Sequence, residues 1–169
     1  MIYTPLSQRK QQTYTQPQGG GIDDIMERLA SVESGGRYDA LGPEVKSGQY
    51  AGEKALGKWQ VMPGNLPDWS REALGREVAP DEFLSNPELQ DQIVRDRMSK
   101  IYDQYGNADD VASVWFSGRP VSKAGNASDV TGTSVPEYIT RFQNAGTSNL
   151  AQTSQPSGLA YVPLSQRHL

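Results

Sequence analysis

The chain contains no cysteine and has a single histidine, His168, among its 169 residues. Without cysteine it can form neither a disulfide nor a thiolate metal site. One histidine next to the last residue argues against a histidine-based catalytic triad or a histidine-rich metal site. We therefore expect no metal and no other cofactor. Acid–base chemistry would have to come from carboxylates, tyrosine or lysine.

Long hydrophobic runs are also missing. No apolar stretch approaches the roughly 18 residues of a membrane-spanning helix, so we expect no membrane span. Residues 1–21 lack the apolar segment of a secretory signal, so we expect no export signal in this sequence.

Both ends of the chain lack acidic residues. All 20 acidic residues lie between Asp23 and Glu137, whereas three of the 16 basic residues lie in the end segments. The middle segment therefore carries 13 basic and 20 acidic residues, a net charge of −7. Such a charge argues against nucleic acid as a partner.

The end segments 1–21 and 147–169 are rich in Gln, Thr, Ser and Gly, which predicts extended polar arms. Both arms contain nearly the same heptad: YTPLSQR at 3–9 and YVPLSQR at 161–167. We interpret the heptads as two copies of a docking peptide, which would have a raised effective concentration on a repetitive partner. The expected docking residues are Tyr3, Pro5, Leu6 and Arg9 in one copy and Tyr161, Pro163, Leu164 and Arg167 in the other.

Residues 22–146 carry mostly helical signals, with apolar side chains at helical spacing and glycines at the expected ends. They predict a mainly α domain. The expected helices run from Ile22 to the Gly35-Gly36 pair, over 63–74, from the Asn86-Pro87 pair to Gly106, from 107 or 109 to 118, and over 135–144 with Gly146 as the stop. We expect long loops at 37–58 and 119–132, and the one candidate strand is the short segment 58–62.

Glu33 is the strongest candidate for chemistry. It ends an amphipathic stretch whose apolar residues could partly desolvate its carboxyl group. Desolvation raises the pKa of a carboxyl group, which suits a general acid near neutral pH. Ser34 could hydrogen-bond a substrate or orient that carboxyl group. The alternative is a solvated glutamate at a helix end.

The segment 57–63, GKWQVMP, is the second candidate. It combines a glycine that permits close approach, the aromatic face of Trp59, the amide of Gln60 and the flexible thioether of Met62. Sugar-binding sites use flat apolar faces together with amide hydrogen bonds. The alternative is a buried turn in which Gln60 bonds to the backbone and Met62 fills a gap.

Together these motifs resemble the lysozyme-like lytic transglycosylases of the soluble-lytic-transglycosylase type. In that family a Glu-Ser pair ends a helix, and here that pair is Glu33-Ser34. A Gly-Leu-Met-Gln-Ile-Met-Pro-like motif, an Ala-Tyr-Asn-x-Gly motif and a Tyr-bearing helix follow, and they correspond to 57–63, 114–118 and Tyr138. The resemblance covers 22–146. The string 55–69 is also similar to phage-borne transglycosylase domains, including those of the internal ejection proteins of T7-like viruses.

The resemblance implies a lysozyme-like fold with a cleft between two lobes. It implies that Glu33 protonates the oxygen between N-acetylmuramic acid and N-acetylglucosamine, then takes the proton of the muramoyl 6-hydroxyl as this hydroxyl closes on C1. The product is a 1,6-anhydro sugar. Tyr138 is expected to hydrogen-bond the Glu33 carboxyl group. The expected substrate contacts are Ser34, Trp59, Gln60, Met62, Trp115, Phe116, Ser117 and Tyr138.

The chain departs from the family pattern at two places. Lys58-Trp59 replaces the usual Leu-Met pair, and Phe116-Ser117 replaces the expected Tyr-Asn pair. The second departure puts in doubt how the acetamido group of the substrate would be held.

Two other functions stay open. A second carboxylate opposite Glu33 would make the protein a hydrolytic muramidase or endolysin, and the candidates are Glu44, Glu53 and Asp68. The domain could also be a catalytically inactive structural module of a virion. The absence of an export signal and the two matching arms favour a virion-associated enzyme that acts on the peptidoglycan of the host cell wall. We expect the two arms to dock to other virion proteins, of the tail or the internal core.

Overall fold

The computed structural model describes residues 21–46, 48, 50–128 and 132–153, and this part of the chain is mainly helical, as expected. Within the described part, no helix is both long and apolar enough to cross a membrane. The expected docking residues, Tyr3 to Arg9 and Tyr161 to Arg167, lie outside the described residues.

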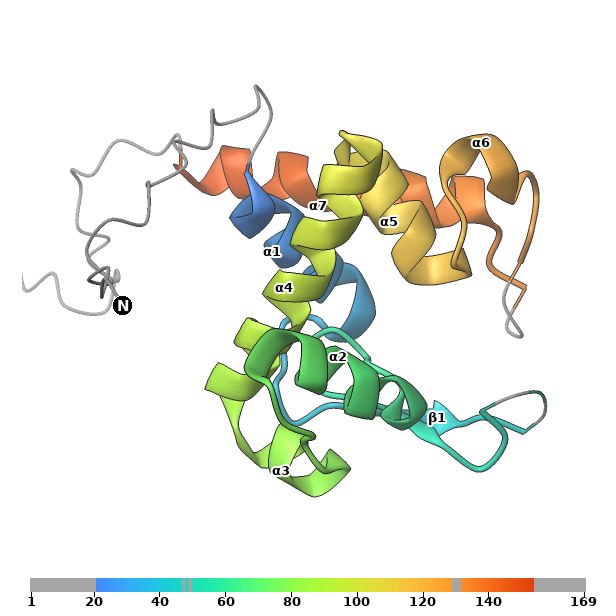
Figure 1. Ribbon diagram of the computed structural model, residues 1–169. Helices are drawn as coiled ribbons and strands as arrows, with labels where there is room; N and C mark the ends of the chain where they lie inside the picture. Colours follow the sequence, from blue (N-terminus) through green and yellow to red (C-terminus); the bar gives the residue numbers. More distant parts are fainter. Residues whose placement is uncertain (1–20, 47, 49, 129–131, 154–169) are drawn as a thin grey trace, which may run out of the picture.

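The helices form an upper and a lower part in the view of Figure 1. The upper part contains α1 (Ile22–Ser34), α5 (Ala108–Ser117), α6 (Val121–Ala124) and α7 (Val135–Thr153). The lower part contains the short 3-10 helix η2 (Pro63–Asn65), α2 (Leu66–Leu74), α3 (Pro80–Ser85) and the antiparallel strands β1 (Leu41–Glu44) and β2 (Lys54–Leu56). The long helix α4 (Pro87–Tyr105) links the parts, because it packs against α1 and α5 on one side and against α2 and α3 on the other.

Local sequence signals set most helix ends, and these predictions are confirmed. The side chain of Asn86 accepts a hydrogen bond from the backbone N–H of Leu89 at the start of α4, 3.2 Å away, and Asn107 does the same for Asp110 at the start of α5, at 2.8 Å. The glycines that follow α1, α2, α4 and α5 all have positive φ angles, between 67° and 78°. Glycine adopts this left-handed conformation without a steric penalty, so it ends helices readily.

The prediction of two long loops was wrong in part. The segment 37–58 contains the β1–β2 pair, and α6 lies within 119–132. The helix α3 was not predicted either. These elements are only 3 to 6 residues long, so they show too few repeats for a hydrophobic period to be visible. The candidate strand 58–62 is instead a turn, closed by two 2.9 Å hydrogen bonds between the backbones of Leu56 and Val61.

The prediction that Gly146 ends the last helix was also wrong, because α7 continues to Thr153 and includes the first residues of the expected C-terminal arm. A Cβ atom at Gly146 would lie 2.2 Å from Cζ of Arg28 on α1. Arg28 is itself held by an ion pair with Asp24, 2.7 Å away, and stacks over the ring of Phe142. Gly146 therefore serves the close approach of α1 and α7 rather than a helix end.

A single hydrophobic core joins the two parts of the molecule. Fully buried aliphatic side chains such as Ile25 on α1 and Ile93 on α4 contribute roughly 1.5–3 kcal/mol each to folding. The core extends into the lower part through Trp59 and Phe83, which are 1% and 0% exposed. The turn that contains Trp59 is therefore fixed against the same core that positions the end of α1.

Candidate active site

Glu33 lies in the last turn of α1, and its carboxyl group accepts a hydrogen bond from the hydroxyl group of Tyr138 on α7. Glu33 and Tyr138 are 105 positions apart in the sequence, and their contact is the one that the family resemblance predicted. Tyr138 is only 4% exposed. Burial, together with the charge of Glu33 and the hydrogen bond to it, raises the pKa of Tyr138 well above 10.0. Tyr138 therefore stays a protonated hydrogen-bond donor to Glu33 at neutral pH.

The ring of Tyr138 stacks on Phe116 of α5, with ring centroids 4.4 Å apart and an angle of 18° between the ring planes. Phe116 also lines a cavity of about 540 Å³. The stack therefore joins the Glu33–Tyr138 pair to this cavity through one aromatic contact.

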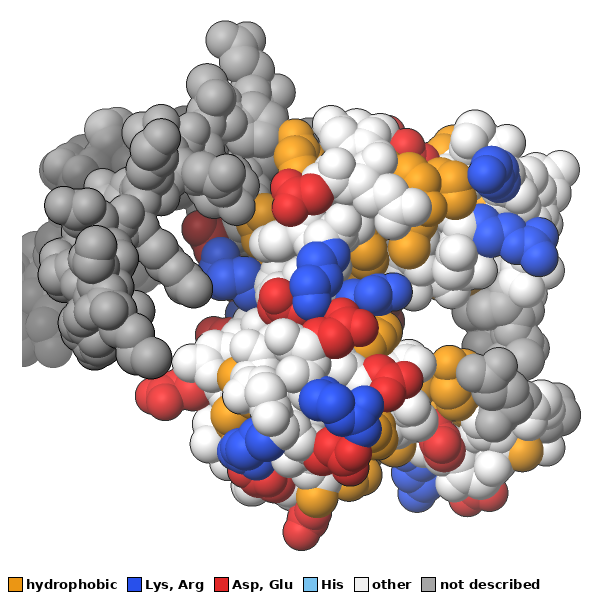
Figure 2. All heavy atoms as spheres, in the orientation of Figure 1, with side chains coloured by type: hydrophobic (Ala, Val, Ile, Leu, Met, Phe, Trp, Pro, Cys, Tyr) orange, Lys and Arg blue, Asp and Glu red, His pale blue; other side chains and the backbone are white. Residues whose placement is uncertain are grey.

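The cavity takes side chains from both parts of the molecule. Tyr50, Met62 and Trp69 line it from the lower part, and Trp115, Phe116 and Ser117 line it from α5. In Figure 2 the face toward the viewer is hollowed on the right, between the upper and the lower part. A second cavity of about 240 Å³ is lined by Phe116 and Ser117 together with Ala127 and Ser128. The two cavities therefore share Phe116 and Ser117 in their linings.

Half of the predicted substrate contacts line the larger cavity: Met62, Trp115, Phe116 and Ser117. Tyr138 lies behind this lining, in contact with Phe116. The hydroxyl group of Ser117 donates to the backbone carbonyl of Ser113, 2.8 Å away, within α5. The other lining residues were not among the predicted contacts, and Tyr50 and Trp69 are the aromatic ones. They come from separate segments, and no local pattern marks them.

The prediction that Trp59 offers its ring to a sugar was wrong, because the ring is 1% exposed and belongs to the core. Its indole N–H donates to the backbone carbonyl of Met26 on α1, 2.9 Å away. The edge of Tyr38 covers the ring at a centroid distance of 5.9 Å. Trp59 therefore holds the turn against α1 and contacts no solvent-filled space.

Gln60 closes this turn with a strained backbone. Its φ angle is +51°, and among the described residues no other non-glycine residue has a positive φ angle. This conformation costs roughly 1–2 kcal/mol for a residue with a Cβ atom. The side-chain amide of Gln60 donates to the backbone carbonyl of Gly57, 3.0 Å away, and a Cβ atom at Gly42 on β1 would come within 2.7 Å of Oε1 of Gln60. The alternative of a turn with Gln60 bonded to the backbone is therefore confirmed.

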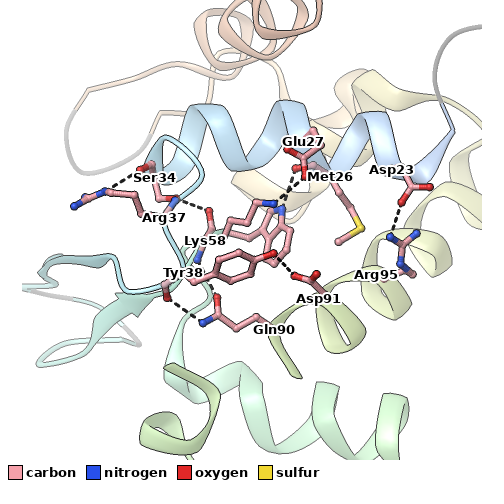
Figure 3. A network of polar contacts seen from close by, with 11 residues as sticks. Asp23, Met26, Glu27, Ser34, Arg37, Tyr38, Lys58, Gln90, Asp91 and Arg95 are labelled. Atoms are coloured by element: carbon pink, nitrogen blue, oxygen red, sulfur yellow. Dashed lines mark hydrogen bonds and ion pairs between the residues drawn. The ribbon is translucent and has the colours of Figure 1, made fainter. Parts of the chain in front are cut away.

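Ser34 also supports the turn. Its hydroxyl group donates to the backbone carbonyl of Lys58, 2.7 Å away, and accepts a hydrogen bond from the backbone N–H of Arg37 at 3.0 Å. Figure 3 shows these contacts beside the end of α1. The predicted substrate contact of Ser34 stays a prediction, but its hydroxyl group already has two backbone partners.

A buried amide that the sequence analysis missed completes this support (Figure 3). Gln90 on α4 is 0% exposed, and its Oε1 accepts the backbone N–H of Lys58 at 3.0 Å. Its Nε2 donates to the carbonyls of Tyr38 and Phe83, at 3.0 and 3.1 Å. A Cβ atom at Gly57 would lie 2.1 Å from Oε1 of Gln90, so only glycine fits there. The signal in the sequence was a polar residue on the apolar face of α4.

The side chain of Lys58 pairs with Glu27 of α1 at 2.8 Å and lies 5.0 Å from the ring centroid of Tyr38. Burial alone would lower the pKa of Lys58, but the hydrogen bond and charge of Glu27, together with Tyr38, outweigh it and raise the pKa above its ordinary value. Lys58 is therefore a charged structural contact between the turn and α1.

The candidates for a second carboxylate, like Glu33 itself, are not among the residues that line the two cavities. Asp68 is exposed and pairs with Arg71 at 2.9 Å, and Glu44 is exposed on β1. Glu53 accepts the backbone N–H of Gly64 at 3.1 Å. Among the described residues, no group of three or more His, Cys, Asp and Glu side chains is arranged to hold a metal ion.

Comparison of the chain with protein-family models, with curated proteins and with solved structures gave no match. The resemblance to lytic transglycosylases therefore rests on the motifs of the sequence.

Proposed function

We propose that this protein is a peptidoglycan lytic transglycosylase with a lysozyme-like fold. The observation that supports this most is the hydrogen bond from Tyr138 to Glu33, joined through Phe116 to an aromatic cavity. Glu33 is not among the lining residues of the two cavities, and Tyr138 and Phe116 connect it to the larger one. A carboxyl group held by a buried donor in such a position suits acid–base catalysis.

In the proposed reaction, Glu33 gives its proton to the oxygen that joins N-acetylmuramic acid to N-acetylglucosamine, and the bond from C1 to this oxygen breaks. The 6-hydroxyl group of the muramoyl residue then attacks C1, and its proton passes to the Glu33 carboxylate. Glu33 ends the cycle protonated, as it began, and the product is a 1,6-anhydro sugar. Because the nucleophile is part of the substrate, no second carboxylate is needed, unlike in ordinary glycosidases.

Tyr138 acts as a positioning residue in this scheme. Its raised pKa keeps it protonated, so it donates a hydrogen bond to Glu33 throughout the cycle. This bond strengthens when Glu33 becomes a carboxylate, because hydrogen bonds to charged groups are stronger than neutral ones. Tyr138 thus stabilises the state that Glu33 reaches after it has given up its proton.

The cavities suit a chain of sugars. The rings of Trp69 and Trp115 lie 5.4 Å apart and both line the larger cavity, where they offer apolar faces to pyranose rings. The second cavity continues past Phe116 and Ser117.

We also propose that the protein is part of a virion and opens the host cell wall locally during genome entry. The support comes from the sequence: two polar arms carry nearly the same heptad, and the acidic middle segment lacks the positive charge that would draw a free enzyme to an anionic wall.

The test is the release of soluble fragments from purified peptidoglycan by the unmodified protein and by Glu33→Gln. We expect Glu33→Gln to be at least about 10²–10⁴-fold slower, the contribution of a positioned general acid. The matched control is Glu88→Gln, which makes the same change at an exposed position in the first turn of α4 and should keep full activity. Equal rates for Glu33→Gln and the unmodified protein would remove Glu33 from the mechanism. No release by the unmodified protein would indicate an inactive module.

A further inference from the structure

Arg97 of α4 lines the larger cavity, next to its aromatic rings. Its guanidinium group lies 5.2 Å from the ring centroid of Trp69, and Trp69 contacts Trp115. Stacking on an aromatic face holds a guanidinium plane in place while leaving its edge available for hydrogen bonds. The cavity therefore contains a fixed cation.

In the described part of the chain, three basic side chains are not exposed: Arg28, Lys58 and Arg97. Arg97 differs from the other two. Arg28 pairs with Asp24 at 2.7 Å and Lys58 pairs with Glu27 at 2.8 Å. Arg97 has no carboxylate within ion-pair distance among the described residues, and its Nε atom is buried without a hydrogen-bond partner.

This difference has an energetic meaning. A partly buried cation without a counter-charge loses hydration, and a cation–π contact such as that with Trp69 offsets only part of this loss, so such groups are normally paired with a carboxylate. The Nε atom of Arg28 also lacks a hydrogen-bond partner, but the charge of Arg28 is balanced by Asp24. The Nε atom of Arg97 is likewise buried from solvent, so a ligand would bind the terminal NH2 groups of its guanidinium. What sets Arg97 apart from Arg28 is the missing counter-charge among the described residues. The partner that fits this charge is a carboxylate, which accepts charge-assisted hydrogen bonds from a guanidinium.

We propose that Arg97 binds a carboxylate of the glycan substrate and so sets its register in the cavity. This inference rests on the proposed function and specifies its substrate further. In a peptidoglycan strand only the muramic acid residues bear an acidic substituent, either the lactyl carboxylate or the peptide attached to it. A carboxylate subsite therefore distinguishes the two alternating sugars and favours one register of the strand in the cavity.

The test measures binding in the Glu33→Gln background, in which bound saccharide is not cleaved. The first probe is a tetrasaccharide of alternating N-acetylglucosamine and N-acetylmuramic acid with free lactyl carboxylates. The second is the same tetrasaccharide with each lactyl group converted to a neutral methylamide. The third carries tetrapeptide stems. Titration calorimetry gives the affinity, and the fluorescence of Trp69 and Trp115 reports occupation of the cavity.

We expect an acidic probe to bind about 10-fold or more tightly than the methylamide, the gain of a charge-assisted hydrogen bond. Arg97→Gln should abolish this preference, and Arg97→Lys should keep part of it. Arg95→Gln, a control on the same helix whose side chain is exposed and pairs with Asp23, should leave the preference unchanged. A preference for the free acid assigns the subsite to the lactyl carboxylate, and a preference for the tetrapeptide form alone assigns it to the stem.

Equal affinities for all three probes would overturn the inference, and this comparison needs no change at Arg97. An acid preference that persists in Arg97→Gln would also overturn it. If the unmodified protein cleaves peptidoglycan without any acid preference, the proposed function stands and this inference fails. If the acidic probe binds through Arg97 but peptidoglycan is not cleaved, the proposed reaction fails and the subsite stands. If no probe binds and the unmodified protein does not cleave peptidoglycan, both fail.

Discussion

Two adjacent residues at the end of α1, Glu33 and Ser34, contact different clusters. Glu33 accepts a hydrogen bond from Tyr138 in the upper part of the molecule, next to Phe116 and the cavity. Ser34 donates to the carbonyl of Lys58 in the lower part, where Gln90 holds the same turn. We call Glu33, Tyr138 and Phe116 the Glu33 cluster. The Gln90 cluster consists of Gln90 and the residues around it, Ser34, Lys58 and Tyr38.

The clusters differ in the groups that they join. The Glu33 cluster links two ionisable side chains, and burial shifts the pKa of one of them upward. In the Gln90 cluster an amide bonds almost entirely to backbone groups, including the N–H of Lys58 and the carbonyls of Tyr38 and Phe83. Bonds to the backbone fix the path of the chain, whereas coupled ionisable groups move protons. The comparison predicts that the Gln90 cluster supports stability and that the Glu33 cluster supports the reaction.

The largest effect on stability is expected from Gly57→Ala. A Cβ atom there would overlap Oε1 of Gln90 at 2.1 Å, and the φ angle of +71° disfavours alanine. Moving Gln90 would break its hydrogen bonds to the backbones of Lys58, Tyr38 and Phe83, so the clash cannot be relieved cheaply. We expect the free energy of unfolding to fall by about 3 kcal/mol or more. Urea denaturation measures it.

The control for this substitution is Gly75→Ala. Its φ angle is +74°, but nothing lies within 4 Å of the added Cβ atom, so it carries the backbone strain without the overlap. It should cost about 1 kcal/mol. Equal losses for both variants would show that Gln90 does not restrict Gly57.

A smaller effect, and one on activity rather than stability, is expected from Tyr138→Phe. Removing the hydroxyl group leaves Glu33 without its buried donor. A hydrogen bond to a charged group is worth about 1.5–3 kcal/mol, so turnover of purified peptidoglycan should fall about 10- to 100-fold. The Phe ring still stacks on Phe116, so the fold is kept.

Tyr38→Phe is the matched change in the other cluster. It removes a hydroxyl group that donates to Asp91 at 2.9 Å. We expect it to lower the free energy of unfolding by about 1 kcal/mol and to leave turnover unchanged. If Tyr38→Phe slows turnover as much as Tyr138→Phe does, the two clusters are not functionally distinct.

The smallest expected effect is on stability at alkaline pH. Because the pKa of Tyr138 is raised above 10.0 in the folded protein, the unfolded chain releases this proton first as the pH rises. The contribution of protonated Tyr138 to the free energy of unfolding is therefore complete below pH 10.0 and is lost progressively above it. Urea denaturation at a series of pH values should show a shallower loss for Tyr138→Phe than for the unmodified protein. Parallel curves would contradict the assignment, since Tyr38 and Lys58 titrate in both proteins.

The helix ends were predictable because their signals are local. Asn86 and Asn107 bond to backbone groups three residues ahead of them, and a positive φ angle at the next glycine needs no distant partner. Gly146 was misjudged because its role depends on Arg28, more than a hundred residues away in the sequence. A glycine that ends a helix and one that admits a neighbouring helix look the same in a sequence.

The candidate site was predictable only in part, for the same reason. The pairing of Tyr138 with Glu33 was expected from the family resemblance, since residues this far apart share no local pattern. Trp59 was expected to contact substrate, but whether an aromatic ring lies in a cavity or in the core depends on what packs over it, here Tyr38 and Met26. Arg97 escaped notice because its missing partner is visible only in three dimensions.

The most direct test of the proposed reaction is the mass of the fragments released from purified peptidoglycan by the unmodified protein. If Glu33 acts first as acid and then as base on the 6-hydroxyl group, the muramoyl ends will be 1,6-anhydro ends, lighter by one water than the ends formed by hydrolysis. Reducing muramoyl ends would contradict this mechanism. They would show that water is the nucleophile and that a second group activates it.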